Sequence, residues 1–289
     1  MSVFLTTKEL ADLLRIKERK VYDLVAKGEV PCSRATGKLL FPRDEVLQWA
    51  AAQGGTAVAP RALPNVLLGS LEPLLEEAVR ASGCGIATYL DGSLDGLSRF
   101  EAGEGIAAGL HVRDPESGEW NLPLVRARLG HLPVVLMHWA RRQSGLLLSE
   151  KATGRVAGLS DLRGLRLVTR QPQSGAYLSF RALLEDAGLD VGAMDVTAIA
   201  GSESEVALTL LENRADAGFG LQHLAERFGL GFLPLIEDSF DLVVNRRAWF
   251  EPPFQALLRH CRCAAFLRQV EAMAGYDISG LGEILFNGP

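Results

Sequence analysis

The chain has 289 residues, of which 48% are hydrophobic and 22% charged, and its formal net charge is −5. This composition is typical of a globular protein, and the length allows two or three domains with a buried core. The start lacks the basic and apolar segments of a signal peptide, and the apolar stretch 129–140 is too short and interrupted to span a membrane. We therefore expect a cytoplasmic protein with no membrane partner.

The charge is unevenly distributed. Nine of the 30 basic residues and seven of the 35 acidic residues fall within positions 1–52, so this segment carries +2 and the remainder −7. A basic segment on an acidic body is typical of a DNA-binding module joined to a sensor, although charge alone is a weak signal.

The first 52 residues predict two short helices, a hairpin and a third helix. Thr6 or Thr7 can cap the first helix, and the second extends from Glu18 to Gly28, where glycine ends it. Residues 29–42 then predict a hairpin, or wing, and residues 43–50 a third helix. Two short helices joined this tightly indicate a helix-turn-helix.

Residues 3–50 resemble the excisionase or MerR-like winged helix-turn-helix family. The residues that match the family pattern are Thr6, Glu9, Ala11, Leu14, Val21, Tyr22, Leu24, Gly37, Phe41, Arg43, Glu45 and Trp49. The resemblance implies DNA binding through basic or aromatic side chains at the start of the second helix and on the wing. These candidates are Lys17, Arg19, Lys20, Tyr22, Arg34 and Lys38.

A linker separates this domain from the rest. Residues 53–65 are small, interrupted by glycine and proline, and lack periodicity. The predicted organisation is a DNA-binding domain at 1–52, the linker at 53–65 and a second domain at 66–289.

From Val66 onward, short apolar strands alternate with amphipathic helices, which predicts an α/β domain with a mostly parallel sheet. Four of the strands end in small, hydroxyl-bearing residues that open a helix: Gly69-Ser70, Gly92-Ser93, Ser174-Gly175 and Gly201-Ser202. Hydroxyls and free backbone N–H groups at helix N-termini suit an anion, and ligands of α/β sheets bind at the carboxyl ends of strands. Any single serine could instead only cap its helix.

Two apolar runs, 132–143 and 231–244, predict strands that cross between two lobes. Lobe 1 then comprises about 66–138 and 240–289, and lobe 2 about 139–239. The C-terminal stretch 253–284 is expected to be helical and to cover lobe 1.

Residues 66–286 resemble the type II periplasmic-binding-protein (PBP)-like domain associated with molybdate and tungstate sensing. The matching segments are 69–70, 92–97, 108–111, 121–123, 141–146, 161–162, 170–175 and 215–218. Two features depart from that family. Gln173-Ser174-Gly175-Ala176-Tyr177 stands where a Gly-Ser-Gly-Thr-Arg run is common, and Leu71-Glu72 where His-Asp is common.

The resemblance and the chemistry of the turns together give the expected ligand-binding set: Ser70, Ser93, Arg170, Ser174, Gly175, Ala176 and Tyr177. Arg170 could alternatively pair with an acid such as Asp186. The four cysteines and the histidines show no metal-ligand spacing, so no metal and no cofactor is expected. No catalytic arrangement is legible, and the chain is not expected to be an enzyme.

The resulting hypothesis is a homodimeric, one-component transcriptional regulator that binds DNA and senses a small oxyanion, molybdate or tungstate by resemblance. Three alternatives stay open. The same architecture could sense another anion or an organic metabolite, the chain could be a molybdenum-cofactor enzyme or accessory protein, or it could be an architectural DNA-binding protein without a ligand.

Overall fold

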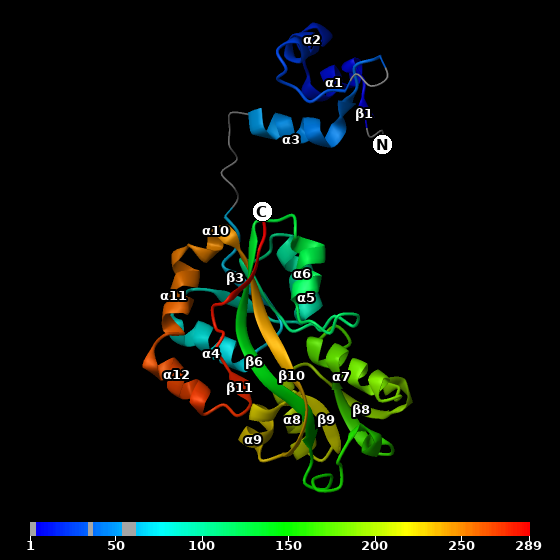
Figure 1. Ribbon diagram of the computed structural model, residues 1–289, viewed down its shortest axis with the longest axis vertical. Coiled ribbons are helices and arrows are strands. Elements are labelled where there is room, and N and C mark those ends of the chain that lie inside the picture. Colours follow the sequence, from blue (N-terminus) through cyan, green and yellow to red (C-terminus); the bar gives the residue numbers. More distant parts are fainter. Residues whose placement is uncertain (1–3, 34–36, 54–61) are drawn as a thin grey trace. The chain divides into compact units, whose positions relative to one another are not determined.

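The computed structural model describes residues 4–33, 37–53 and 62–289, and the chain separates into two compact units, residues 1–62 and 63–289 (Figure 1). The elements of the first unit are β1 (Phe4–Leu5), α1 (Thr7–Leu14), α2 (Glu18–Ala26), β2 (Phe41–Pro42) and α3 (Arg43–Gln53). They follow the predicted helix-turn-helix order, with a hairpin segment between α2 and α3.

A capping box opens α1. The Thr6 hydroxyl accepts a hydrogen bond from the backbone N–H of Glu9, whose carboxylate accepts one from the Thr6 N–H at 2.7 Å. Leu10, Val21 and Phe41, none of them exposed, bring α1, α2 and the hairpin into one small core. A bridge between Ser33 and Leu40 joins the two arms of the hairpin, and β2 also pairs antiparallel with the N-terminal strand β1.

The second unit is built on one ten-stranded sheet in the order β4-β3-β5-β10-β6-β9-β7-β8, with β11 and β12 added to β6. The strands are β3 (Val66–Gly69), β4 (Ala87–Tyr89), β5 (Ala107–Leu110), β6 (Val134–Leu148), β7 (Arg166–Arg170), β8 (Asp195–Ala200), β9 (Ala217–Leu221), β10 (Gly231–Asn245), β11 (Tyr276–Asp277) and β12 (Ile284–Asn287). The helices are α4 (Pro73–Ser82), α5 (Ser93–Glu101), α6 (Leu122–Leu129), α7 (Gly175–Asp186), α8 (Glu203–Leu211), α9 (Gln222–Phe228), α10 (Arg246–Trp249), α11 (Pro252–His260) and α12 (Ala264–Glu271), with 3₁₀ turns at Leu159–Leu162 and Val191–Ala193.

The 15-residue strands β6 and β10 cross from one lobe into the other (Figure 1). They pair antiparallel along their whole length, from Val134 against Asn245 to Leu148 against Gly231. The register shifts twice, between Pro234 and Ile236 and between Phe240 and Asp241. These irregularities flank the middle of the crossing, where the backbone twists most readily.

Four apolar clusters cover the two faces of each lobe. In lobe 1, α4, α11 and α12 pack on one face of the sheet, and α5 and α6 pack on the other. In lobe 2, α7 packs on one face, and α8 and α9 on the other. Neighbouring strand residues alternate between these clusters, as with Leu67 and Leu68, because side chains alternate along a strand.

The C-terminal stretch differs from the expectation of a helix over 253–284. α12 ends at Glu271, and the chain then returns to the sheet as β11 and β12, both antiparallel to β6. Gly275 and Gly282 adopt positive φ angles of 74° and 91°, which a continuing helix does not allow.

Candidate functional site

The serine-bearing turns play different structural parts. Ser174 and Ser202 are the N-caps of α7 and α8, and their hydroxyls accept hydrogen bonds from the N–H groups of Tyr177 and Glu205, each at 3.1 Å. Ser93 is the first residue of α5 and caps nothing. Ser70 lies before α4, whose N-cap is Glu72. Capping therefore occupies the acceptor side of two of these hydroxyls and leaves the other two for other partners.

His111, directly after β5, brings Ser70 and Ser93 together. Its imidazole Nε2 lies 2.9 Å from the Ser70 hydroxyl, and its backbone N–H donates to the Ser93 hydroxyl at 3.2 Å. All three residues are buried. Two of the expected donors, which are contributed by different strand-to-helix turns, thus converge on one histidine that the sequence did not assign to the site.

The tautomer of His111 follows from its other partner. Nδ1 lies 3.1 Å from Nη2 of Arg142, and a guanidinium can only donate. Nδ1 is therefore the acceptor, and in the neutral ring Nε2 carries the proton and donates to Ser70. The Ser70 and Ser93 hydroxyls then act as acceptors toward His111, and neither hydroxyl proton has an acceptor among the described residues. Both can donate to a ligand.

The N-terminus of α7 reaches the same place from lobe 2. A Cβ atom on Gly175 would lie 2.6 Å from Nε2 of His111 and still closer to its carbonyl oxygen, so only glycine permits this approach. A Cβ on Gly92, just before α5, would lie 3.2 Å from the carbonyl oxygen of Gln173. The start of α5 in lobe 1 and the start of α7 in lobe 2 therefore meet across His111, and both helix dipoles present their positive ends there.

The remaining expected residues lie apart from this cluster or have other partners. The Ser174 hydroxyl donates to the Gln171 carbonyl at 2.9 Å in addition to capping α7, so both of its hydrogen-bonding functions are used. Ala176 is buried in the apolar cluster under α7. Tyr177 is half-buried in the first turn of α7, where its N–H is used by the cap.

Arg170 serves the turn between β8 and α8. Its guanidinium donates to the carbonyl oxygens of Ala200 and Gly201, each at 3.1 Å, and lies 3.9 Å from the Glu203 carboxylate. Burial lowers the pKa of Arg170, and the nearby carboxylate of Glu203 opposes that shift. The nearby acid is thus Glu203 and not the suggested Asp186.

An ion pair in the middle of the crossing strands completes the cluster. Arg142 on β6 is fully buried and donates to Asp238 on β10 through Nε at 2.8 Å and Nη2 at 3.0 Å. Ser144 donates to the same carboxylate at 2.9 Å. Burial disfavours the charged carboxylate, but the Arg142 guanidinium holds the pKa of Asp238 below its usual range. In the sequence, the only local indication of this pair is a charged residue, Arg142, within an apolar run that predicts a strand.

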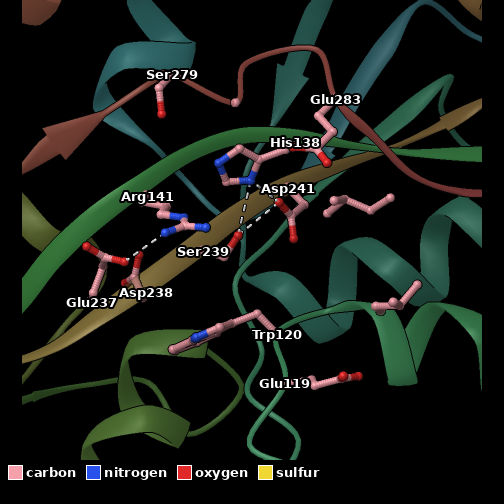
Figure 2. Close-up of a pocket in the computed structure, with 13 residues that line it drawn as sticks. Glu119, Trp120, His138, Arg141, Glu237, Asp238, Ser239, Asp241, Ser279 and Glu283 are labelled. Atoms are coloured by element: carbon pink, nitrogen blue, oxygen red, sulfur yellow. Dashed lines mark hydrogen bonds and ion pairs between the residues drawn. The ribbon is translucent and has the colours of Figure 1, made fainter.

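A cavity of about 750 Å³ lies beside the crossing strands (Figure 2). Its lining includes Trp120, His138, Asp241, Glu119 and Glu283. His138 Nδ1 contacts the Asp241 carboxylate at 2.8 Å, and Asn121 donates to the same carboxylate at 2.6 Å. By contrast, the carboxylates of Glu119 and Glu283 have no hydrogen-bonded or ion-paired partner within the described ranges. This lining is unsuited to an anion.

The predicted DNA-facing side chains lie on the surface of the first unit. Lys17, Arg19 and Lys20 are exposed at and just after the N-cap of α2, and Tyr22 is 52% exposed. Lys38 is exposed beside the hairpin turn, and Arg34 lies outside the described residues. α2 therefore presents three cationic side chains and one aromatic ring at its N-terminal end, the part of a recognition helix that reaches base edges.

Within residues 4–33, 37–53 and 62–289, none of the helices has the length and apolar character to cross a membrane. The same part of the chain contains no group of three or more His, Cys, Asp or Glu side chains able to hold a metal ion.

Comparisons with known proteins agree with the two-unit architecture. Residues 75–262 match the family model described as the PBP superfamily domain, and residues 4–54 match that of a helix-turn-helix domain. The "Uncharacterized protein YvgK" of Bacillus subtilis (strain 168) is 27% identical over 307 residues, which cover 97% of each chain. These matches extend over nearly the whole sequence.

A solved structure with the same fold is that of a "Putative Phosphate ABC Transporter Substrate-Binding Protein with Bound Phosphate from Clostridium perfringens". It covers 72% of this chain and 97% of its own, with a TM-score of 0.50 and 11% identity. A similarity at this identity establishes the fold only. Together with the family matches it confirms the predicted fold class, an N-terminal helix-turn-helix followed by a two-lobed α/β PBP-like domain.

Proposed function

Since the chain belongs to the PBP superfamily and carries a helix-turn-helix domain, we propose that it is a DNA-binding transcriptional regulator whose PBP-like domain senses a small oxyanion. The observation that carries the proposal is the convergence of the Ser70 and Ser93 hydroxyls on His111, against the start of α7. Molybdate or tungstate is the proposed ligand, on the resemblance described above.

The donor set suits a tetrahedral anion. Each hydroxyl already accepts from His111 and keeps its proton for a ligand, and the N-termini of α5 and α7 add backbone N–H groups and the positive ends of two dipoles. Because the two helices belong to different lobes, an anion held between them favours the arrangement in which the lobes are closed on each other. In this proposal, closure alters how the DNA-binding domains are presented to DNA.

A homodimer and a non-catalytic role are part of the proposal. One small helix-turn-helix contacts few base pairs, and regulators of this kind gain specificity by binding two half-sites as a symmetric pair. Sedimentation of the full-length protein tests the oligomeric state. A monomer at micromolar concentration would remove dimerisation from the proposal without affecting the ligand site.

Thermal melting of the full-length protein with molybdate, tungstate, sulfate and phosphate tests the ligand. A ligand that binds the folded state stabilises it by about 2.7 kcal/mol at a hundredfold excess over its dissociation constant. We expect molybdate or tungstate to raise the melting temperature, and the same anion to change the affinity of the protein for its own promoter DNA. If none of the four anions raises the melting temperature, the oxyanion proposal fails.

The cavity beside the crossing strands favours a second candidate ligand for the same regulator, a small organic cation. The volume of about 750 Å³ suits a metabolite-sized ligand, and Trp120 offers an aromatic face. Glu119 and Glu283 add carboxylates that have no partner among the described residues. The same melting assay with arginine and spermidine tests it. A shift that is absent in Glu283→Gln would support this ligand in place of the oxyanion.

A further inference from the structure

Arg142 combines complete burial with an unused hydrogen-bond donor. Nε and Nη2 are engaged by Asp238, and Nη2 also contacts His111, whereas Nη1 has no hydrogen-bond partner within the described part of the chain. A buried donor without a partner loses the hydrogen bonds that water would give it. The guanidinium also lies 4.8 Å from the centroid of the Phe240 ring, which disperses some of its charge but offers no acceptor.

One residue, His111, connects this guanidinium to the proposed anion donors Ser70 and Ser93. It donates to His111, and His111 donates to Ser70 through its ring and to Ser93 through its backbone. A chain of three short contacts therefore connects the buried cation to both free hydroxyls. An anion that binds to those hydroxyls enters a buried region where, without a nearby positive charge, its desolvation is costly.

The same guanidinium joins the two crossing strands. Arg142 on β6 and Asp238 on β10 are partners in the strand register, and β10 has a register shift on either side of this pair. Within the described part of the chain, Arg142 and Ser144 donate hydrogen bonds to Asp238, and Nδ1 of His111 lies 3.9 Å from the same carboxylate. Any second anion near Arg142 competes with Asp238 for the guanidinium.

We propose that Arg142 is the cationic ligand-binding residue of the oxyanion site, and that the bound anion competes with Asp238 for its guanidinium. The inference rests on the proposed function, since it assigns a residue to that site. Nη1 donates to the anion, and the weakened Arg142–Asp238 pair loosens the contact between β6 and β10 at the middle of the crossing. Ligand binding thereby acts on the two strands that connect the lobes.

Three variants separate a binding role from a structural one. Removing only Arg142 would leave Asp238 buried and unpaired, which can unfold the protein. The double variant Arg142→Gln/Asp238→Asn removes both charges, keeps the size of the side chain at position 238 and leaves a polar amide at position 142. Asp238→Asn alone removes the competing carboxylate. Arg142→Lys keeps the positive charge, but a single ammonium group cannot offer one pair of N–H donors to Asp238 and another to an anion. Arg80→Gln, a charge loss on an arginine that is 78% exposed on α4, is the matched control.

Isothermal titration calorimetry with whichever of the four anions stabilises the wild-type protein gives the affinities, and circular dichroism confirms folding. We expect the double variant to bind roughly tenfold or more weakly, since a hydrogen bond to a charged group contributes at least this factor. Asp238→Asn should bind more tightly than wild type, Arg142→Lys more weakly, and Arg80→Gln equally. If Arg142→Lys or the folded double variant binds the anion with wild-type affinity, the inference is wrong. It is also wrong if Asp238→Asn and the double variant lose anion affinity to the same extent. A wild-type protein that binds none of the anions instead contradicts the proposed function itself.

Discussion

Gly175 packs directly against His111, so that the first residue of α7 in lobe 2 contacts the residue that organises the donors of lobe 1. His111 holds Ser70 through its ring and Ser93 through its backbone N–H. The absence of a side chain at position 175 is what allows the positive end of a helix dipole to approach these hydroxyls. This pair of residues thus joins the two lobes at the proposed ligand site.

Gly175→Ala should destabilise the protein and weaken oxyanion binding. The added Cβ would lie 2.6 Å from His111 Nε2, and neither backbone nor ring can yield without displacing the Ser70 contact. Overpacking of this kind typically costs about 1–3 kcal/mol. Urea unfolding and anion titration measure the two effects. Gly158→Ala, where an added Cβ meets nothing within 4 Å, is the control and should change neither quantity.

Ser70→Ala and Ser174→Ala should have different effects, although both residues belong to the expected ligand set. Ser70 retains a free hydroxyl proton, so its loss should weaken anion binding with little change in the anion-free melting temperature. Ser174 caps α7, so its loss should cost about 1 kcal/mol of stability. Melting curves with and without anion distinguish them. An anion shift that survives in Ser70→Ala and disappears in a folded Ser174→Ala would reverse these assignments.

Acid should destabilise the PBP-like domain partly through Asp238. The folded-state pKa of this carboxyl is lowered by Arg142 although burial opposes the shift, and an unfolded aspartate has a pKa of about 3.9. Its contribution to the stability of the folded state is therefore fully present above about pH 4. This contribution is lost as the pH falls, because only the unfolded state then takes up the proton. In Asp238→Asn, the free energy of unfolding measured with denaturant should fall less steeply between about pH 5 and pH 2 than it does in the wild type. Identical slopes would show that this pair does not contribute to acid sensitivity.

Lys20→Ala should weaken DNA binding without altering the melting temperature of the protein. Lys20 is exposed in the first turn of α2, where a lysine contacts phosphate irrespective of base sequence. The affinity should fall for all sequences, and the slope of log affinity against log salt should decrease by about 1. Lys8→Ala, an equal charge change on the exposed face of α1, should leave both measurements unchanged. Equal effects of the two substitutions would argue against α2 as the recognition helix.

Most of the fold could be predicted from local patterns. Thr6 and Glu9 form the capping box that their spacing allows, and the two apolar runs became the crossing strands β6 and β10. The stretch after Glu271 could not be predicted, because its short strands are defined by pairing with the distant β6. Long-range pairing of this kind leaves little trace in the local sequence.

The candidate site was less predictable from the sequence. Ser70 and Ser93 could be proposed because strand-to-helix turns have a recognisable composition, but Ser174 shows that the same composition also serves a cap. His111 and Arg142 could not be assigned, because their roles depend on contacts 31 residues apart in the chain. The hydrogen bonds of Arg170 to the carbonyl oxygens of Ala200 and Gly201, 30 and 31 residues further on, likewise depend on the fold and leave no local pattern.

β6 pairs with β10, β9, β11 and β12, so a single strand carries backbone hydrogen bonds to both lobes and to the C-terminal segment. Loss of this strand would expose all four apolar clusters of the second unit together. The two lobes are therefore cooperative in unfolding and should melt as one calorimetric transition. The helix-turn-helix, whose core is a separate cluster, is free to melt at a different temperature.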